Sequence, residues 1–365
     1  RRDFTINAMA YNEKEGLVDP FGGQADLQSG ILRAVGVPHQ RFTEDALRIL
    51  RLYRFAARFG FAIDPPTAQA AQELCAHLDC VSVERIEEEL AKLLNAPAPA
   101  AYLDEKILGV VLPELSPEAL AAAKPVVDAC PAGEQALPVR LAALLLSLGE
   151  DGTRRTLRRL RCSNNRIEET AVLVREARGY DGSFLFGHEF ELRHPADALC
   201  LERHSHPAGR CPNSNSLFPP QAAVVAVAGH SIARPIAFGN RVPPQRTVLR
   251  ETTVTPGFTI YARRLLGKYN LCTVQRLAAL GTALQPERAA EFAKFSQLAK
   301  QLDADGVCCR VSQLAVNGRD LMAAGVPAGP GIRKVLEALL DGVIREEYPN
   351  ERQALLAAVQ QLAAS

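Results

Sequence analysis

The segment EDALRILRLYRF at 44–55 combines two acids with arginines that recur every three or four positions. This spacing predicts one amphipathic helix that begins near Thr43, with Glu44 and Asp45 on the same side as Arg48. The arginines predicted to form a basic stripe along it are Arg48, Arg51, Arg54 and Arg58. The segment fits either a solvated helix face, whose ion pairs contribute about 0.2–0.5 kcal/mol each, or a ligand site.

A second basic stretch runs from Thr153 to Arg161, with five arginines in nine positions. Leu157 and Leu160 supply an apolar side, so the arginines should lie on an exposed helix face that could follow phosphates. A solubilising helix face is the alternative. The arginines predicted to contact RNA are Arg154, Arg155, Arg158 and Arg159. Because the net charge is only +1, any nucleic-acid contact must come from local patches of this kind.

Cysteine and hydropathy patterns bear on the compartment. Nine cysteines occur without C-x-x-C spacing, which favours free thiols in a reducing cytoplasm over a disulfide framework. No run of 18 apolar residues appears, so we expect a cytoplasmic protein with no membrane segment. The sequence indicates no oligomeric state.

Residues 181–258 differ from the rest of the chain. They hold nine of the 24 prolines and five of the seven histidines, with no sustained helical or strand period. Cys200, His204, His206 and Cys211 suggest a metal site, but their spacing matches no standard zinc pattern. We interpret the segment as anomalous, either a lineage-specific insertion or an out-of-frame translation.

Three motifs resemble the nucleotidyltransferase family that contains bacterial CCA-adding enzymes and bacterial poly(A) polymerases. They are RRDFTINAMAYN at 1–12, LVDPFGGQADLQSGILRAVG at 17–36 and RFTEDALRILRLYRFAARFGF at 41–61. The resemblance covers residues 1 to about 115 and returns over roughly 261–363, which includes AVNGRDLMAAGVPAGPGIRKVLEALL and YPNERQALL.

The resemblance implies a mainly α protein with an elongated multi-helix neck, body and tail and a partial α/β head at the N-terminus. The expected divisions are 1–36 for the end of the head, 37–115 for a neck with the base-template helix, 116–180 for a body, 181–258 for the anomalous segment, and 259–365 for an RNA-binding body and tail.

In this family a glycine-rich turn and a D-x-D carboxylate pair that holds Mg²⁺ precede the RRDFTINA motif. Neither precedes that motif in this chain, so the resemblance implies an N-terminally truncated chain with its metal ligands upstream of residue 1. We therefore predict no metal ligand and no catalytic residue in this chain, and no nucleotide incorporation by this fragment alone.

Base recognition follows from the chemistry of a carboxylate beside a guanidinium. Cytosine and adenine both present an amino donor next to a ring-nitrogen acceptor, whereas uracil and guanine present the opposite pattern. Asp45 and Arg48 have the groups to accept from the first and donate to the second. The resemblance assigns them this template role, with Glu44 orienting Arg48.

The resemblance also implies contacts to the rest of the nucleotide. Arg51 and Arg54 would meet the triphosphate, and Arg2 would approach from the opposite wall. Asp3 and Asn7 are candidates for the ribose, with local turn and strand-end hydrogen bonding as the alternative.

The implied function is template-independent addition of C and A, from CTP and ATP, to tRNA 3′ ends. A poly(A) polymerase, or a relative that adds only CC or only A, is the second interpretation; a non-catalytic RNA-binding remnant is the third. No His-Asp doublet occurs anywhere in the chain, so we predict no phosphohydrolase activity.

Overall fold

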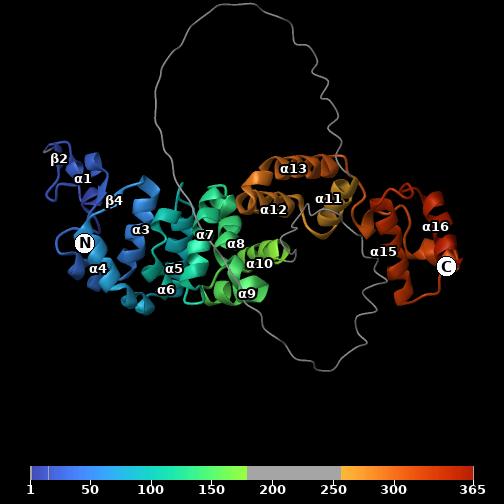
Figure 1. The fold of residues 1–365 in the computed structure, drawn as a ribbon, viewed down its shortest axis with the longest axis horizontal. Coiled ribbons are helices and arrows are strands. Elements are labelled where there is room, and N and C mark those ends of the chain that lie inside the picture. Colours follow the sequence, from blue (N-terminus) through green and yellow to red (C-terminus); the bar gives the residue numbers. More distant parts are fainter. Residues whose placement is uncertain (1, 15, 179–255, 365) are drawn as a thin grey trace, which may run out of the picture. The chain divides into compact units, whose positions relative to one another are not determined.

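The computed structural model describes residues 2–14, 16–178 and 256–364. Helices dominate these residues (Figure 1), which confirms the prediction of a mainly α fold. The segment 181–258 falls almost entirely outside the described residues, and with it the Cys200, His204, His206 and Cys211 set.

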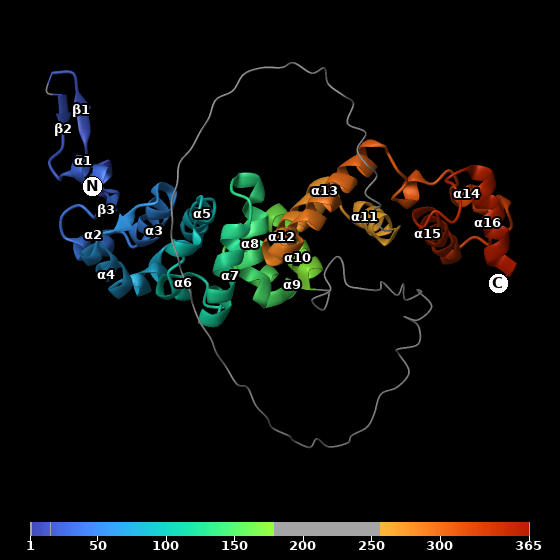
Figure 2. The same ribbon diagram turned by 45° about the horizontal axis from the view of Figure 1, so that its top comes forward.

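The N-terminal part is a small α/β unit. Strands β1 (Ala10–Asn12) and β2 (Gly16–Val18) form an antiparallel hairpin with Tyr11 opposite Leu17. Figure 2 shows this hairpin standing out from α1 (Gly23–Ser29). A 3₁₀ turn occupies Thr5–Asn7, so the first strand begins only at Ala10.

Strand β3 (Ile31–Leu32) pairs in parallel with β4 (Ala62–Ile63), and an isolated antiparallel bridge joins Phe4 to Ala34. These pairings bring the first residues of the chain onto the segment around residue 34, and the segment around residue 62 onto β3. The pairing places Asp3, whose carbonyl accepts from the Val35 N–H at 3.1 Å, next to the helices that follow.

The predicted single helix from Thr43 is wrong. Two helices occur, α2 (Pro38–Glu44) and α3 (Leu47–Phe59), and the chain between them is extended at Asp45, with φ −154° and ψ 101°. Thr43 lies inside α2, where its hydroxyl donates to the His39 carbonyl, so it is not an N-cap. The predicted i,i+4 pair of Glu44 with Arg48 forms across this helix break, whereas Asp45 pairs with Arg85 instead.

Helices α4 (Pro65–Glu73) and α5 (Val83–Leu94) complete this part of the molecule, and α5 packs on α3. A carboxylate on Asp64 caps α4, as expected for a helix that starts at a proline. The apolar face of α5 includes Leu90 and Leu94, both in the hydrophobic core.

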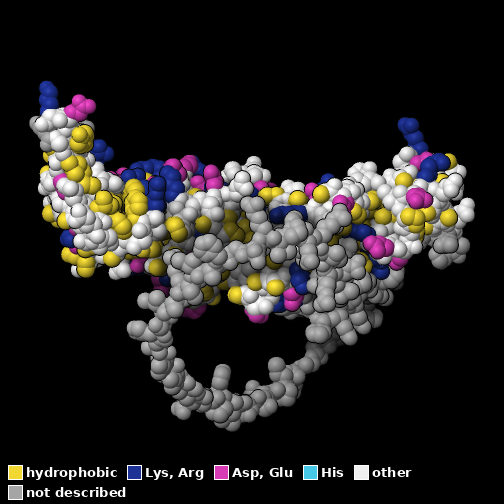
Figure 3. Space-filling model, turned by 90° about the horizontal axis from the view of Figure 1, so that it is seen from above, with side chains coloured by type: hydrophobic (Ala, Val, Ile, Leu, Met, Phe, Trp, Pro, Cys, Tyr) yellow, Lys and Arg dark blue, Asp and Glu magenta, His cyan; other side chains and the backbone are white. Residues whose placement is uncertain are grey.

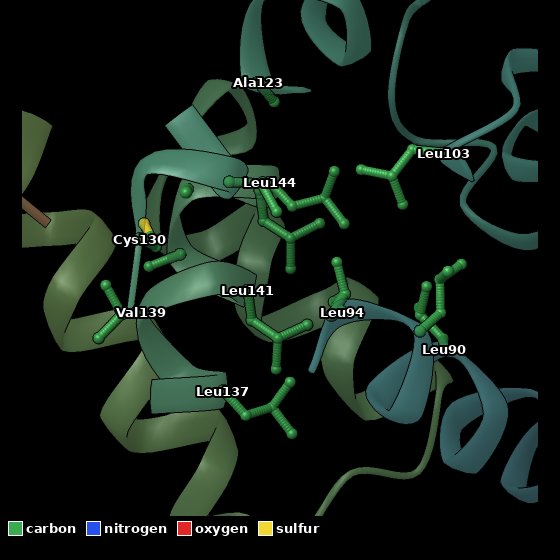
Figure 4. Packing of buried hydrophobic residues seen from close by; sticks show 14 of the residues in the cluster. Leu90, Leu94, Leu103, Ala123, Cys130, Leu137, Val139, Leu141 and Leu144 are labelled. Carbon is green, nitrogen blue, oxygen red and sulfur yellow. The ribbon is translucent and has the colours of Figure 1, made fainter. Parts of the chain in front are cut away.

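The next helices continue the same core. They are α6 (Glu105–Val111), α7 (Pro117–Ala129), α8 (Leu137–Leu145), α9 (Gly149–Arg159) and α10 (Asn164–Arg178). All nine residues of α8 are buried, and Figure 4 shows Leu141 of α8 next to Leu94 of α5 inside the core. Helix α8 is therefore the central element against which α5, α7 and α10 pack.

A cation on α8 lies within this core. Arg140 on α8 is 1% exposed and donates to three backbone carbonyls. Those of Leu94 and Ala96 lie at the C-terminal end of α5, and that of Cys130 lies at the C-terminal end of α7. The last carbonyls of a helix have no partner within the helix, so a cation there satisfies them and complements the helix dipole. Burial lowers the pKa of Arg140 and raises that of the neighbouring Cys130 thiol to about 12.

Helices α11 (Pro256–Lys268), α12 (Leu271–Leu284) and α13 (Ala289–Ala304) join the same core. On α10, the buried Glu176 accepts from the Lys268 ammonium at 2.8 Å and from the Tyr269 hydroxyl at 2.5 Å. These bonds connect the chain on either side of the undescribed segment. Burial alone would raise the pKa of the Glu176 carboxyl. Its partners Lys268, Tyr269 and Arg175 together have the larger, opposite effect, so the pKa lies below its usual range.

A second, smaller hydrophobic cluster holds the C-terminal helices α14 (Gly318–Ala323), α15 (Pro330–Ile344) and α16 (Arg352–Ala364). Asn317 caps α14 by accepting from the backbone N–H groups of Arg319 and Asp320. All seven cysteines in the described ranges carry free thiols. Within those ranges, no helix has the length and hydropathy of a membrane-spanning segment.

Candidate functional site

The break between α2 and α3 places Asp45 at the N-terminal end of α3. One carboxylate oxygen, Oδ1, accepts from the Leu47 N–H at 3.1 Å. The other, Oδ2, accepts from the guanidinium of Arg85 on α5 at 3.0 Å. The Asp45 side chain is 32% exposed, so solvent or a ligand can still reach it.

Arg48, the predicted partner of Asp45 in base recognition, is held by α2. Its Nη1 donates to Glu44 Oε2 at 2.7 Å and to the Arg41 carbonyl at 2.9 Å. The hydrogen bond from Arg48 is the main cause that lowers the pKa of Glu44, and the positive charges of Arg41 and Arg48 lower it as well. The guanidinium therefore has a fixed orientation before any ligand binds, and Glu44 contributes to fixing it.

Asp3 connects the first strand segment to α3. Its Oδ2 accepts from Arg51 Nε at 2.6 Å, and its Oδ1 lies 3.5 Å from Arg48 Nε. The predicted ribose role of Asp3 stays a prediction, and in this structure the carboxylate faces arginines. One acid thus gathers two of the predicted nucleotide-binding arginines.

Arg54 and Glu89 form a buried ion pair one turn further along α3. Arg54 is 8% exposed and Glu89 4%, and Arg54 Nε approaches Glu89 Oε2 to 2.6 Å without hydrogen-bond alignment. Burial lowers the pKa of Arg54, and the charge of Glu89 opposes that shift. The guanidinium carbon also lies 3.9 Å from the centre of the Phe55 ring, a cation–π geometry. Arg54 is therefore less accessible than Arg51, whose side chain is 32% exposed.

Arg2 and Asn7 lie on the same N-terminal segment. Arg2 is exposed and forms no ion pair with any residue in the described ranges, whereas Asn7 ends the 3₁₀ turn with its N–H on the Phe4 carbonyl. A buried polar network fixes this segment, because the Thr5 hydroxyl donates to Asp26 at 2.7 Å and Asp26 accepts from Arg33. The contacts of Arg2 and Asn7 with a nucleotide remain predictions.

The four arginines predicted to bind RNA divide into two pairs on α9. Arg159 makes a two-pronged bond to Glu114, at 2.7 and 2.8 Å, and Arg154 pairs with Glu150 and Glu168. Arg155 and Arg158 are exposed and have no acidic partner among the described residues. The sequence predicts one exposed basic face, but acids on α9 itself, on α10 and in the turn after α6 neutralise half of it.

Two residues of the site were missed in the sequence, Arg85 and Glu89 on α5. The signal for Glu89 was present, because it falls on the apolar face with Ile86, Leu90 and Leu93, where an acid requires a buried partner. Arg85 carries no such signal, since its partner Asp45 lies 40 positions away. Figure 3 shows Lys and Arg side chains interspersed with acids over the part of the molecule where α3 and α5 lie.

Metal ligands were not predicted in this chain. Within residues 2–14, 16–178 and 256–364, no three His, Cys, Asp or Glu side chains cluster closely enough to hold a metal ion. The acids nearest to the candidate site, Asp3, Glu44, Asp45 and Glu89, all pair with arginines instead.

Family models match three parts of the chain. A poly A polymerase head domain matches residues 1–33, a probable RNA- and SrmB-binding site of polymerase A matches 60–118, and a putative tRNA nucleotidyltransferase domain 2 matches 259–359. A CCA-adding enzyme of Streptococcus pneumoniae (strain CGSP14) is 53% identical over 97 residues, which cover 27% of this chain and 24% of that enzyme. One of Lactiplantibacillus plantarum is 50% identical over 103 residues, 28% of this chain and 25% of that enzyme.

Over these segments the chain is similar to CCA-adding enzymes and to poly(A) polymerase domains. Its matched region spans about a quarter of the length of these relatives. The fold agrees: the Bacillus stearothermophilus CCA-adding enzyme in complex with CTP aligns with a TM-score of 0.66 at 23% identity, over 100% of this chain and 73% of that one. The Thermotoga maritima CCA-adding enzyme complexed with tRNA aligns at 0.58 and 19% identity, over 99% and 72%.

Proposed function

We propose that this chain serves template-independent addition of C and A, from CTP and ATP, to the 3′ end of tRNA. The observation that carries the proposal is the junction of α2 and α3. There a solvent-accessible carboxylate, Asp45, precedes an arginine, Arg48, whose guanidinium is already oriented by Glu44. The relatives from Streptococcus pneumoniae and Lactiplantibacillus plantarum are CCA-adding enzymes, which supports this choice.

Base choice follows from the two groups. A carboxylate accepts from the amino group of C or A, and a guanidinium donates to the adjacent ring nitrogen. With U or G, acceptor faces acceptor and donor faces donor, a mismatch that costs on the order of 1–3 kcal/mol for each polar group left unpaired. The protein itself would thus act as the template, with Asp45 and Arg48 as the reading pair.

The triphosphate would bind beside this pair. Arg51 is the most suitable cation because it is part-exposed and lies one turn beyond Arg48 on α3. Arg2 is exposed and unpaired among the described residues, so it can approach the phosphates as well. Arg54 is buried against Glu89, so it would attract the phosphates mainly through its charge.

Phosphoryl transfer of this type uses Mg²⁺ to activate the attacking 3′-hydroxyl and to stabilise the pyrophosphate leaving group. The described residues offer no cluster of ligands that fits such ions, so we nominate none. The residues of this chain would bind and orient the nucleotide.

The tRNA would be bound through phosphates by Arg155 and Arg158 on α9 and through the region 259–359, which matches a tRNA nucleotidyltransferase domain. We place the protein in the cytoplasm, where tRNA maturation and free thiols are both expected. A poly(A) polymerase, or a relative restricted to CC or A, is the second candidate, since two of the matching models describe polymerase A domains.

Equilibrium binding to the 365-residue chain tests the proposal. We expect tighter binding of CTP and ATP than of UTP and GTP, and tighter binding of tRNA lacking its CCA end than of an unstructured oligoadenylate of equal length. A preference for ATP alone together with equal RNA affinities would favour the poly(A) polymerase. Equal affinity for all four nucleotides, with tRNA binding retained, would leave a non-catalytic RNA-binding protein.

A further inference from the structure

Arg85 is a charged residue of the candidate site to which the proposed chemistry gives no role. It lies on the first turns of α5, is half exposed, and donates from Nη2 to Asp45 Oδ2 at 3.0 Å. This bond spans 40 residues of sequence and joins α5 to the junction of α2 and α3. Arg85 therefore contacts the carboxylate that would read the base.

Asp45 follows the last residue of α2 and precedes the first turn of α3, in an extended conformation. Its carbonyl accepts from the Arg48 N–H at 3.1 Å, which holds its backbone at the start of α3. The orientation of its side chain depends on what holds the carboxylate: Oδ1 is held by the Leu47 N–H and Oδ2 by Arg85. Two donors on two oxygens fix the plane of the carboxylate. Each oxygen keeps a further lone pair, so Oδ2 can accept an amino group while Arg85 stays in place.

Helix α5 is a firm base for this contact. It packs on α3 through core residues that include Leu90 and Leu93, and its Glu89 pairs with Arg54 inside the same interface. Arg85 lies one turn before Glu89. The helix thus presents a cation to the acid at the start of α3 and an acid to the arginine further along it. Both contacts fix the register of α3 against α5.

We propose that Arg85 is a positioning residue for base choice, which holds the carboxylate of Asp45 in the orientation that accepts the amino group of C or A. This inference rests on the proposed function. Without Arg85, Asp45 keeps its charge and its bond to the Leu47 N–H, but its second oxygen is free to rotate. Discrimination between bases should fall, while binding of the triphosphate by Arg51 should not.

The test compares Arg85→Gln, Arg85→Lys and a matched control, Glu84→Gln, by calorimetric titration with CTP, ATP, UTP and GTP. Glu84 is the neighbouring residue on α5, and it pairs with the exposed Arg161 rather than with Asp45. Arg85→Gln should reduce the ratio of CTP to UTP affinity by about three- to tenfold. Arg85→Lys, which keeps a donor and a charge, should restore part of that ratio, and Glu84→Gln should leave it unchanged.

The outcomes separate the two proposals. If the wild-type chain shows no preference for C and A, the proposed function fails. If the wild type discriminates and Arg85→Gln discriminates equally well, the inference about Arg85 is overturned. An equal loss of affinity for all four nucleotides in Arg85→Gln would also overturn it, because that pattern assigns Arg85 to phosphate binding or to general stability.

Discussion

Helices α3 and α9 carry similar patterns of arginine in the sequence but use them differently. On α3 the arginines converge on two acids from other elements, Asp3 and Glu89, and one of the arginines is buried. On α9 two arginines are neutralised at the surface and two, Arg155 and Arg158, are exposed. Arginine spacing therefore predicts a helix face, whereas the neighbouring acids decide whether that face is a pre-organised site or an open electrostatic surface.

The largest expected effect is on stability, at the buried end of α3. Glu89→Gln leaves the charge of Arg54 buried without its partner, and we expect the free energy of unfolding to fall by about 3–5 kcal/mol. On α9, Glu114→Gln removes the partner of the part-exposed Arg159 and should cost about 0–1 kcal/mol. Urea unfolding of both variants measures the contrast, and equal losses would show that the two helices are alike.

A second effect concerns the accessible arginine of α3. Arg51→Ala should weaken binding of all four nucleotides by roughly tenfold without changing their ranking, because a phosphate contact is common to all of them. Arg58→Ala is the matched control, since Arg58 lies on the same helix near Phe59 and away from Asp3. A change in ranking with Arg51→Ala would place Arg51 at the base instead of the phosphates.

The smallest effect should separate the two pairs on α9. Replacing Arg155 and Arg158 with Gln should weaken tRNA binding about three- to tenfold and reduce the salt slope by about two. Replacing Arg154 and Arg159 instead should change the slope less, since acids already neutralise these two. Filter binding between about 50 and 200 mM salt measures both. Equal slopes for the two double variants would mean that the ion pairs open when RNA binds.

Much of the helical fold could be predicted from periodicity. The amphipathic α5 and the apolar α8 are examples, because the pattern of each depends on residues close together in sequence. The break at Asp45 could not, since an acid there fits either the first turn of one helix or the link between two helices. Local spacing does not distinguish these possibilities.

The site shows the same limit. The pairing of Glu44 with Arg48 follows from a separation of four residues, and it survives the break. The pairing of Asp3 with Arg51 and that of Asp45 with Arg85 join positions 48 and 40 residues apart. Only tertiary packing brings these groups together, so the sequence could identify the arginines of α3 but neither Arg85 nor the long-range partner of each acid.

Base recognition by Asp45 and Arg48 is the step on which the proposed function depends most. Its most direct test is the binding of CTP and UTP to Asp45→Ala, with the wild type titrated alongside. We expect the preference for CTP to fall by about tenfold or more, through loss of CTP affinity, while the affinity for UTP changes little because Arg51 still holds the triphosphate. An Asp45→Ala chain that keeps the full wild-type preference for CTP would show that Asp45 does not recognise the base. Asp45 would then be a charge that stabilises the start of α3.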